Sequence, residues 1–389
     1  MRKVYLDYSA TTPVKEEVLK EMIPYFTEKF GNPSSLYDIG LESKEAVTHA
    51  REQVAALINA KPQEIYFTAG GTEADNWAVF GTVEKLKSKG NHIITTKIEH
   101  HAMLPSCAFL EKEGCQITYL DIDQEGRIDL KQLEDAITDK TVLISIMLVN
   151  NEIGTIQPVK EAAAIAKKHG ILFHTDAVQG LGNVPIDVKD MGVDMMSVSS
   201  HKIYGPKGSG ALYIRKGVNI ANYMHGGGQE SRKRAGTENL AGIIGFGKAA
   251  ELARINFESH VKHCTKLRDY LKDRILSEIP DTFINGTMEG RHPGNLNITF
   301  KYIEGESILL LLNQYGISVS TGSACSSASL EPSHVLTALG VPVEMIHGTV
   351  RFTVGDFTTK EDIDYVVDHL KTIVEKLREI SSVNSKKGW

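Results

Sequence analysis

Two stretches of this chain, each an apolar run that ends on polar residues, decide the fold. Residues 171–177 read Ile-Leu-Phe-His-Thr-Asp-Ala, and residues 194–202 read Asp-Met-Met-Ser-Val-Ser-Ser-His-Lys. Each run has the length of a buried strand. Ligands gather at the carboxyl ends of strands in open α/β sheets, so Asp176 and Lys202 mark one sheet edge as the expected place of a site.

Similar apolar runs recur through the first two thirds of the chain. They lie at residues 65–69, 92–96, 116–122, 141–149, 171–177 and 194–200. Most are separated by a segment with helical spacing, such as residues 159–169, which Gly170 closes as a C-cap. Strands with few charges, linked by helices, favour a largely parallel sheet covered on both faces. The pattern therefore predicts one large α/β domain.

The pattern changes after about residue 255. A charged helical stretch at residues 263–279 precedes two short strands, and a last helix carries an apolar stripe from Ile363 to Ile380. Thr358 and Glu361 fit a capping box at its start. We predict a large domain of residues 15–257, a small α+β domain of residues 1–14 and 258–380, and a frayed tail at residues 381–389.

Composition narrows the functional classes. Of 389 residues, 41% are hydrophobic and 24% charged, and 43 basic against 49 acidic residues give a net charge of −6. These values are typical of a globular protein and do not favour a nucleic-acid partner. The longest uncharged stretch, residues 307–330, holds too many polar residues to enter a bilayer. No CxxC spacing is present among Cys107, Cys115, Cys264 and Cys325, so we expect a cytoplasmic protein without membrane contact.

A phosphate site is one interpretation of residues 68–73, Thr-Ala-Gly-Gly-Thr-Glu. Here a strand passes through glycines into a helix, and the first N–H groups of that helix, with the Thr72 hydroxyl, would suit an anion. An ordinary turn capped by Thr72 is the alternative.

Asp176 and Lys202 extend this pattern. A carboxylate at a buried strand end needs a partner, and a partly desolvated lysine has the lowered pKa that Schiff-base chemistry uses. Taken singly, each residue fits a surface position equally well. Together, an anion site, an aspartate and a lysine in this order match the needs of pyridoxal phosphate.

Longer motifs make a family resemblance specific. The chain resembles the cysteine desulfurases of the NifS/IscS type, in the class V aminotransferase family of fold-type I pyridoxal-phosphate enzymes. The resemblance spans nearly the whole chain and rests on Tyr5-Leu6-Asp7-Tyr8-Ser9-Ala10-Thr11-Thr12-Pro13, Gly31-Asn32-Pro33, Glu99-His100, Val149-Asn150-Asn151-Glu152-Ile153-Gly154, Ser199-Ser200-His201-Lys202-Ile203-Tyr204-Gly205-Pro206-Lys207-Gly208, His225-Gly226-Gly227-Gly228-Gln229-Glu230, Arg234-Ala235-Gly236-Thr237 and Arg351-Phe352. It implies an α/β fold with a mostly parallel seven-stranded sheet covered by helices, and a smaller α+β C-terminal domain.

The resemblance also implies roles around the cofactor. Lys202 would form the Schiff base, Asp176 would pair with the pyridine nitrogen, and His100 would stack on the ring and help to move protons. Further cofactor contacts are implied for Gly71, Thr72, Asn151, Gln179, Ser199 and His201, and for Thr237 of a second subunit in a homodimer. Arg351 would bind the substrate α-carboxylate, with Asn32 and Asn151 beside it. The chain departs from many relatives at Gly70-Gly71 and at Ser200.

Cys325 indicates the reaction. It lies among small residues, at positions 318–329, and a surface loop of this composition moves easily. A small buried hydrophobe is the ordinary alternative for a lone cysteine. The resemblance implies that Cys325 attacks the sulfur of L-cysteine, leaving L-alanine and a persulfide for an iron–sulfur scaffold or a tRNA-thiolation protein. No resident metal is implied, only transient contact of Cys325 with a nascent iron–sulfur cluster.

Other functions fit parts of the pattern. An aminotransferase of the same fold needs Lys202 and Asp176 but leaves the 318–329 segment unexplained. Selenocysteine as the substrate would make the chain a selenocysteine lyase, which the sequence does not distinguish. An interaction protein without catalysis would have no need for an intact set of cofactor residues.

Overall fold

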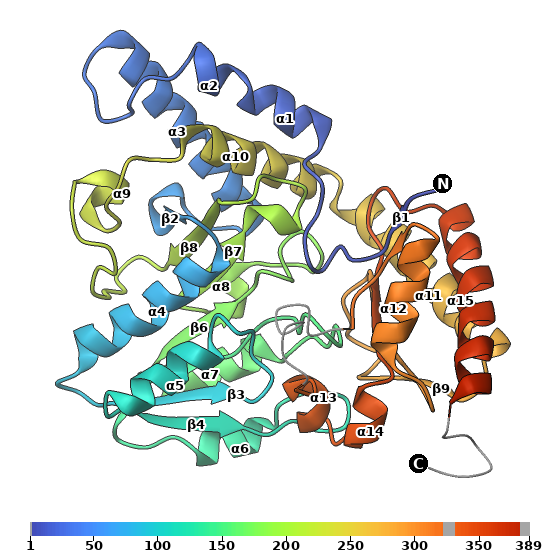
Figure 1. Ribbon diagram of the computed structural model, residues 1–389. Helices are drawn as coiled ribbons and strands as arrows, with labels where there is room; N and C mark the ends of the chain where they lie inside the picture. The colour runs from blue at the N-terminus through green and yellow to red at the C-terminus, as the bar shows by residue number, and fades with distance from the viewer. Residues whose placement is uncertain (1, 322–330, 382–389) are drawn as a thin grey trace.

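A seven-stranded sheet forms the centre of the larger part of the molecule (Figure 1). The computed structural model describes residues 2–321 and 331–381. The strands, in their order across the sheet, are β2 (Ile65–Thr68), β8 (Gly210–Ile214), β7 (Met195–Ser199), β6 (Leu172–Asp176), β5 (Thr141–Ser145), β3 (His92–Thr96) and β4 (Gln116–Leu120). Only β8 runs antiparallel to its neighbours. The predicted mostly parallel seven-stranded sheet is therefore confirmed, and β8 is the strand that the apolar runs did not indicate.

Neighbouring residues of each strand point to opposite faces of the sheet, and both faces are buried. Ile93, Leu143 and Met195 pack in one core cluster with Trp77. Their direct neighbours Ile94, Ile144 and Met196 pack in another. This alternation is the period-2 pattern of a strand. Because both sets are apolar, the strands read as continuous apolar runs in the sequence.

Ten helices accompany the sheet in this part of the described chain. They are α1 (Glu16–Met22), α2 (Pro24–Thr27), α3 (Asp38–Leu57), α4 (Gly71–Leu86), α5 (Leu104–Lys112), α6 (Leu130–Asp135), α7 (Val159–Lys168), α8 (Val188–Met191), α9 (Gln229–Arg232) and α10 (Leu240–Ile255). Helices α4 and α5 supply apolar side chains to the cluster around Trp77. Helices α3, α7 and α10 cover the other face.

A second body lies beside the first and has its own core (Figure 1). Its strands β9 (Thr282–Ile284), β10 (Asn295–Phe300) and β12 (Thr349–Thr353) form an antiparallel sheet, and β1 (Val4–Tyr5) pairs in parallel with β11 (Ile317–Ser318). The helices that follow in the chain are α11 (Phe257–Glu278), α12 (Gly305–Gln314), α13 (His334–Ala338), α14 (Val343–Ile346) and α15 (Lys360–Ile380). Val4 and Leu6 pack in this core with residues from Cys264 onward, which supports the proposed small domain of residues 1–14 and 258–380.

Helix α15 begins one residue later than expected. Its capping box joins Thr359 and Asp362, not Thr358 and Glu361. The reason is that the Thr358 hydroxyl already accepts the Gly355 N–H, at 3.1 Å, in the preceding turn. The predicted tail lies outside the described residues, apart from Ser381.

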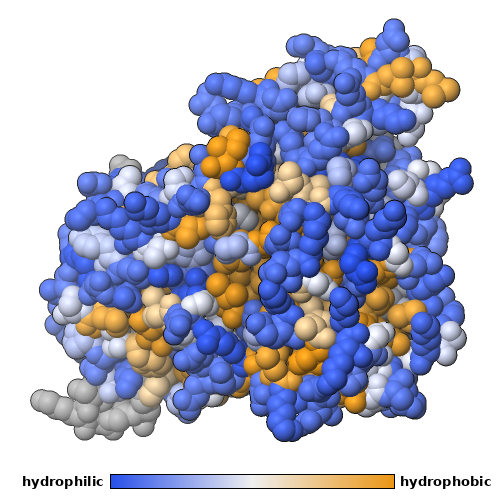
Figure 2. Space-filling model, turned by 180° about the vertical axis from the view of Figure 1, so that it is seen from behind, coloured by the Kyte–Doolittle hydropathy of each residue, from blue (hydrophilic) through white to orange (hydrophobic). Residues whose placement is uncertain are grey.

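The surface is mostly hydrophilic when seen from behind (Figure 2). Exposed apolar side chains occur on the first helices and the segment that joins them, including Phe26, Phe30 and Leu36. Within the described residues, none of the helices combines the length and the apolar character needed to cross a bilayer.

A buried ion pair fastens α9 to α3. Arg51 donates through both terminal nitrogens to the Glu230 carboxylate, at 2.6 and 2.8 Å, and the backbone N–H of Phe67 donates to the same group at 3.0 Å. Only 2% of the Glu230 side chain is exposed. Glu230 also adopts a positive φ of 45°, a backbone conformation that non-glycine residues rarely take. These three hydrogen bonds hold the residue there.

We predict that Glu230→Ala lowers the free energy of unfolding by about 3–5 kcal/mol, because it leaves the Arg51 charge without its carboxylate partner and the Phe67 N–H without its acceptor. Urea unfolding followed by circular dichroism measures the change. Glu84→Ala is the matched control, since its pair with Lys87 lies on the surface and contributes about 0–1 kcal/mol. Equal losses in the two variants would contradict the prediction.

Candidate active site

A cavity of about 230 Å³ lies at the carboxyl ends of β6 and β7. Because these strands are parallel, with Asp176 paired to Ser197, the residues that follow β6 and β7 leave the sheet at the same edge. The cavity is lined by Ala10, Gly71, Thr72, Asp75, His100, Met147, Asn151, Asp176, Val178, Gln179, Ser199, His201 and Lys202. Every residue predicted to contact the cofactor is among these, with the exception of Thr237.

One end of the cavity is suited to an anion. Helix α4 starts at Gly71 with Gly70 as its N-cap, and no described side chain caps it. Thr72 lies inside the helix, so its alternative role as the capping residue is wrong. A Cβ atom at Gly71 would lie 2.7 Å from Val178, so only glycine fits there. A second, more open cavity shares Gly71, Thr72, Ser199 and His201 and connects this end to solvent. Uncapped N–H groups at a helix start attract phosphate.

A buried carboxylate defines another side. Oδ1 of Asp176 accepts the backbone N–H of Val178 at 2.8 Å. Burial raises the pKa of Asp176 to about 6, while that N–H group and the charge of Lys202 oppose the rise. No described side chain forms a salt bridge with Asp176. A cation placed against it would restore its full charge.

The amine of Lys202 is held by the N-terminal segment. Nζ donates to the carbonyl of Ser9 at 2.5 Å and to that of Ala10 at 2.8 Å. The Ser9 carbonyl also accepts from the side chain of Gln179, at 3.0 Å. Thr12 continues the contact, since its backbone N–H donates to the carbonyl of His201 at 3.0 Å. Lysine and cavity are therefore covered by residues that precede the first helix.

The cavity histidines are neutral. Burial, followed by the charge of Lys202, lowers the pKa of His100 to about 4, and the same two causes lower the pKa of His201 to about 4. Nδ1 of His100 accepts the N–H of Ala102 at 3.1 Å, so its proton resides on Nε2. A neutral imidazole can stack on an aromatic ring without repelling a neighbouring ammonium group.

Arg351 lies next to the cavity, not in its lining. One guanidinium nitrogen donates to the backbone carbonyl of Asn151 at 2.9 Å, and another to Oδ1 of Asp7 at 2.8 Å. Asn151 thus joins the predicted substrate residue to the cavity wall. Asn32 and Thr237 are both exposed on this chain and do not line either cavity.

Cys325 falls outside the described residues, but the chain on both sides of its segment is placed. Ser320 exchanges backbone hydrogen bonds with Arg351, at 2.6 and 3.2 Å. On the other side, Ser333 donates to Glu152 at 2.6 Å and His334 contacts the carbonyl of Glu99 at 3.0 Å. The described residues that flank this segment thus lie beside Arg351 on one side and beside Glu99, the neighbour of His100, on the other.

Two acidic residues of the site were not predicted. Asp75 lines the cavity with 1% exposure, and burial, followed by the charge of Asp176, raises the pKa of Asp75 well above its usual value. Asp7 orients Arg351. The sequence carries a signal for both positions. Asp7 stands in one of the motifs of the family resemblance, and Asp75 follows the predicted phosphate turn by two residues.

Three features fit pyridoxal phosphate. They are an uncapped helix start for its phosphate, a buried carboxylate for its ring nitrogen, and a lysine amine that shares the cavity with both. The fit rests on these residue types and on their meeting in one cavity.

Comparisons with known proteins agree with this geometry. The model of the class V aminotransferase family matches residues 4–366. The cysteine desulfurase IscS of Dictyoglomus turgidum is 56% identical over 388 residues, covering 100% of this chain and 98% of that protein. A solved structure of a NifS-like protein superposes with a TM-score of 0.91 at 38% identity, covering 97% of this chain and 100% of that one. A solved structure described as SspA in complex with cysteine has a TM-score of 0.81 at 36% identity, covering 92% and 100%.

We predict that Lys202→Ala abolishes covalent capture of pyridoxal phosphate. After borohydride reduction and proteolysis, mass spectrometry of the wild type should find the reduced adduct on the peptide that holds Lys202. Lys207→Ala, a change of the same kind five residues later, should keep that adduct. An adduct that persists on another lysine in Lys202→Ala would place the Schiff base elsewhere.

Proposed function

This chain belongs to the class V aminotransferase family, and within it to the cysteine desulfurases of the NifS/IscS type, and from this premise we propose that it removes sulfur from L-cysteine and releases L-alanine. The observation that carries the proposal is the meeting of an anion site, Asp176 and Lys202 in one cavity, with Arg351 at its edge. The relative of known structure that holds cysteine supports the choice of substrate.

We propose pyridoxal phosphate as the cofactor, held by the residues that line the two cavities. Its phosphate would bind at the start of α4, with Thr72, Ser199 and His201. Its ring would be held by His100, which would stack on it, and by Asp176, which would pair with its nitrogen. When bound, this group supplies an electron sink for the pair released at the substrate Cα.

The chain's own residues would bind and orient the substrate. The Arg351 guanidinium binds the α-carboxylate, and its direction is set by Asp7 and by the carbonyl of Asn151. Lys202 moves the Cα proton, because its amine lies at the same cavity and the carbonyls of Ser9 and Ala10 stabilise its protonated form. Neutral His100, which carries its proton on Nε2, is available as a proton donor.

Cys325 would take the sulfur. Its thiolate attacks the substrate sulfur, the Cβ–S bond breaks, and the electron pair of that bond stays on the carbon, which a proton then converts to the methyl group of alanine. The product on the protein is a persulfide. Cys325 follows Ser320 by five positions, which allows a reach of up to about 17 Å from the anchor beside Arg351.

We propose a homodimer with shared sites. Thr237 is exposed and does not line the cavities of its own chain, while the phosphate end of the site opens to solvent. A second subunit could place its Thr237 there. Exposed Phe26, Phe30 and Leu36 supply apolar surface of the kind that dimers bury.

For the persulfide we propose an iron–sulfur scaffold or a tRNA-thiolation protein as acceptor, in the cytoplasm. The three cysteines that the structure describes, Cys107, Cys115 and Cys264, are all free thiols, which supports a reducing compartment.

We predict that Cys325→Ala keeps the bound cofactor and loses sulfide release. The cavity residues are unchanged, whereas no comparable nucleophile remains in the segment. Sulfide and alanine are measured together with L-cysteine and a reductant. Without reductant, the wild type should gain one sulfur on the peptide that contains Cys325.

Cys107→Ala is the matched control and should behave as the wild type, because burial raises the pKa of Cys107 to about 12. Sulfide release by Cys325→Ala at close to the wild-type rate would contradict the proposed role of Cys325 as the sulfur acceptor. So would sulfur added to Cys107, Cys115 or Cys264.

We predict that mixing Lys202→Ala with Thr237→Ala subunits restores activity. In such a heterodimer both defects fall in one site, and the other site is intact. Activity should rise toward half the wild-type value in purified, differentially tagged heterodimers. Heterodimers that form but stay inactive would rule out shared sites.

A further inference from the structure

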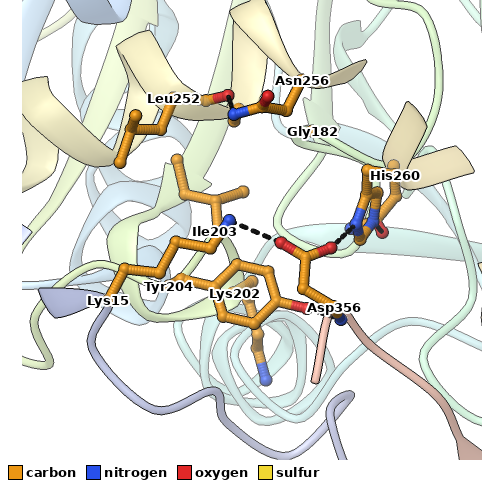
Figure 3. Close-up of a pocket in the computed structure, with 11 residues that line it drawn as sticks. Lys15, Gly182, Lys202, Ile203, Tyr204, Leu252, Asn256, His260 and Asp356 are labelled. Carbon is orange, nitrogen blue, oxygen red and sulfur yellow. Dashed lines mark hydrogen bonds and ion pairs between the residues drawn. The ribbon is translucent and has the colours of Figure 1, made fainter. Parts of the chain in front are cut away.

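A small pocket of about 20 Å³ lies behind Lys202, between the two core bodies (Figure 3). Lys202 lines both this pocket and the candidate active site. In Figure 3 the Lys202 amine points away from Asp356 and His260, so these residues act on the lysine from its backbone side.

Asp356 is the centre of the pocket. Its Oδ2 accepts from the amine of Lys15 at 2.5 Å, and its Oδ1 is in direct hydrogen-bond contact with Nδ1 of His260. Its backbone N–H donates to the Tyr204 hydroxyl at 2.7 Å. Although burial opposes ionisation, the hydrogen bonds and charges of His260 and Lys15 lower the pKa of Asp356 to about 2. We name these four residues, Lys15, Tyr204, His260 and Asp356, the latch.

The hydrogen bonds of Asn183 fix the orientation of the His260 ring. The Asn183 amide group donates to the carbonyls of Gln179 and Leu181, at 3.3 and 3.2 Å, so its oxygen faces Nε2 of His260 at 3.0 Å. Nε2 must therefore carry a proton. Nδ1 faces Oδ1 of Asp356, so a proton lies between these two atoms.

A metal ion in place of that proton is the competing explanation, because Cys264 lies 3.8 Å from Nδ1 of His260. Two observations favour the proton. Nδ1 and Oδ1 of Asp356 are in direct contact, which leaves no room for an ion between them. The Cys264 sulfur also lies 3.9 Å from the carbonyl of Val354, to which its S–H group can donate.

Tyr204 transmits the position of Asp356 to the lysine. It follows Lys202 by two residues and has a φ of +65°, in the left-handed region that is costly for a bulky side chain. Its backbone N–H donates to Thr12 at 2.9 Å, its carbonyl accepts the N–H of Lys15 at 3.1 Å, and its ring lies 4.6 Å from the Lys15 amine. With the bond from Asp356, these contacts hold the strained turn from which the Lys202 side chain starts.

The same aspartate lies five positions after Arg351, the residue proposed to bind the substrate carboxylate. Asp356 follows β12 by three residues, and Arg351 stands in the middle of that strand. We propose that Asp356 is a positioning residue for Lys202, which holds the turn at Tyr204 and so keeps the lysine amine aligned with the carboxylate site at Arg351. This inference rests on the proposed function, since it concerns the same lysine and arginine.

The test compares Asp356→Asn with Asp364→Asn in the holoenzyme. Asp364 is the matched control, because it too is an aspartate that forms two ion pairs. Its partners are Lys360 and Arg274, and it does not contact the latch. Circular dichroism in the visible band of the bound cofactor, divided by the absorbance of that band, reports the orientation of the group attached to Lys202. Loss of stability alone lowers occupancy and leaves this ratio unchanged.

In Asp356→Asn we expect a reduced ratio and a kcat for sulfide release that falls about 10- to 100-fold. KM for cysteine should change by less than about 3-fold, since Arg351 keeps its contacts with Asp7 and Asn151. Tyr204→Phe, which removes only the hydroxyl acceptor, should move both values in the same direction by a smaller factor. It decides the outcome if Asp356→Asn does not fold.

Several results would overturn the inference. The first is that Asp356→Asn and Tyr204→Phe have the same ratio of circular dichroism to absorbance, and the same kcat, as Asp364→Asn. Another is one equivalent of zinc in the purified wild type that Cys264→Ser loses, which would make His260 a metal ligand. A wild type that neither binds the cofactor nor releases sulfide would refute the proposed function and this inference with it, whereas a working wild type with unaffected variants would refute only the positioning role.

Discussion

The parallel alignment of β5, β6 and β7 is the constraint on which the rest of the structure depends. Hydrogen bonds between these strands bring three carboxyl ends to one edge, and the chain leaves that edge at Asn151, Asp176 and Lys202. The adjoining start of α4 adds a positive helix end to the same place. Residues that lie tens of positions apart thus share one cavity because a sheet forms, and no local motif is sufficient for this.

The second condition is the cover over the lysine. The segment before α1 leaves the small body, passes across Lys202 and enters the large body, with Asp7 on the arginine at one end and Lys15 on Asp356 at the other. Its backbone carbonyls at Ser9 and Ala10 hold the Lys202 amine. The site is therefore a product of the interface between the two bodies, and the reacting groups on each depend on this shared segment.

The sequence was informative where a residue's role follows from its place on a strand or in a motif. The sheet, the anion site, Asp176 and Lys202 were all accessible in this way. What could not be read were contacts between distant segments. The role of Asp7 depends on its contact with Arg351, which is 344 positions away in the sequence. The left-handed backbone at Tyr204 is not predictable from the residue type, because such positions usually hold glycine. The capping box moved by one residue because the Thr358 hydroxyl was engaged locally, which a pattern of residue types does not reveal.

The N-terminal segment contacts residues that lie more than 300 positions later in the chain, and this has a consequence for biosynthesis. Strand β1 lies against β11, the N–H of Ser9 donates to the hydroxyl of Thr353 at 2.9 Å, and Asp7 reaches Arg351. A ribosome adds Thr353 344 residues after Ser9. Contacts of such sequence separation form late in folding. Until then, Asp7 and Ser9 lack their partners Arg351 and Thr353. The edge of the site at Arg351 should thus assemble only after residue 353 has been made.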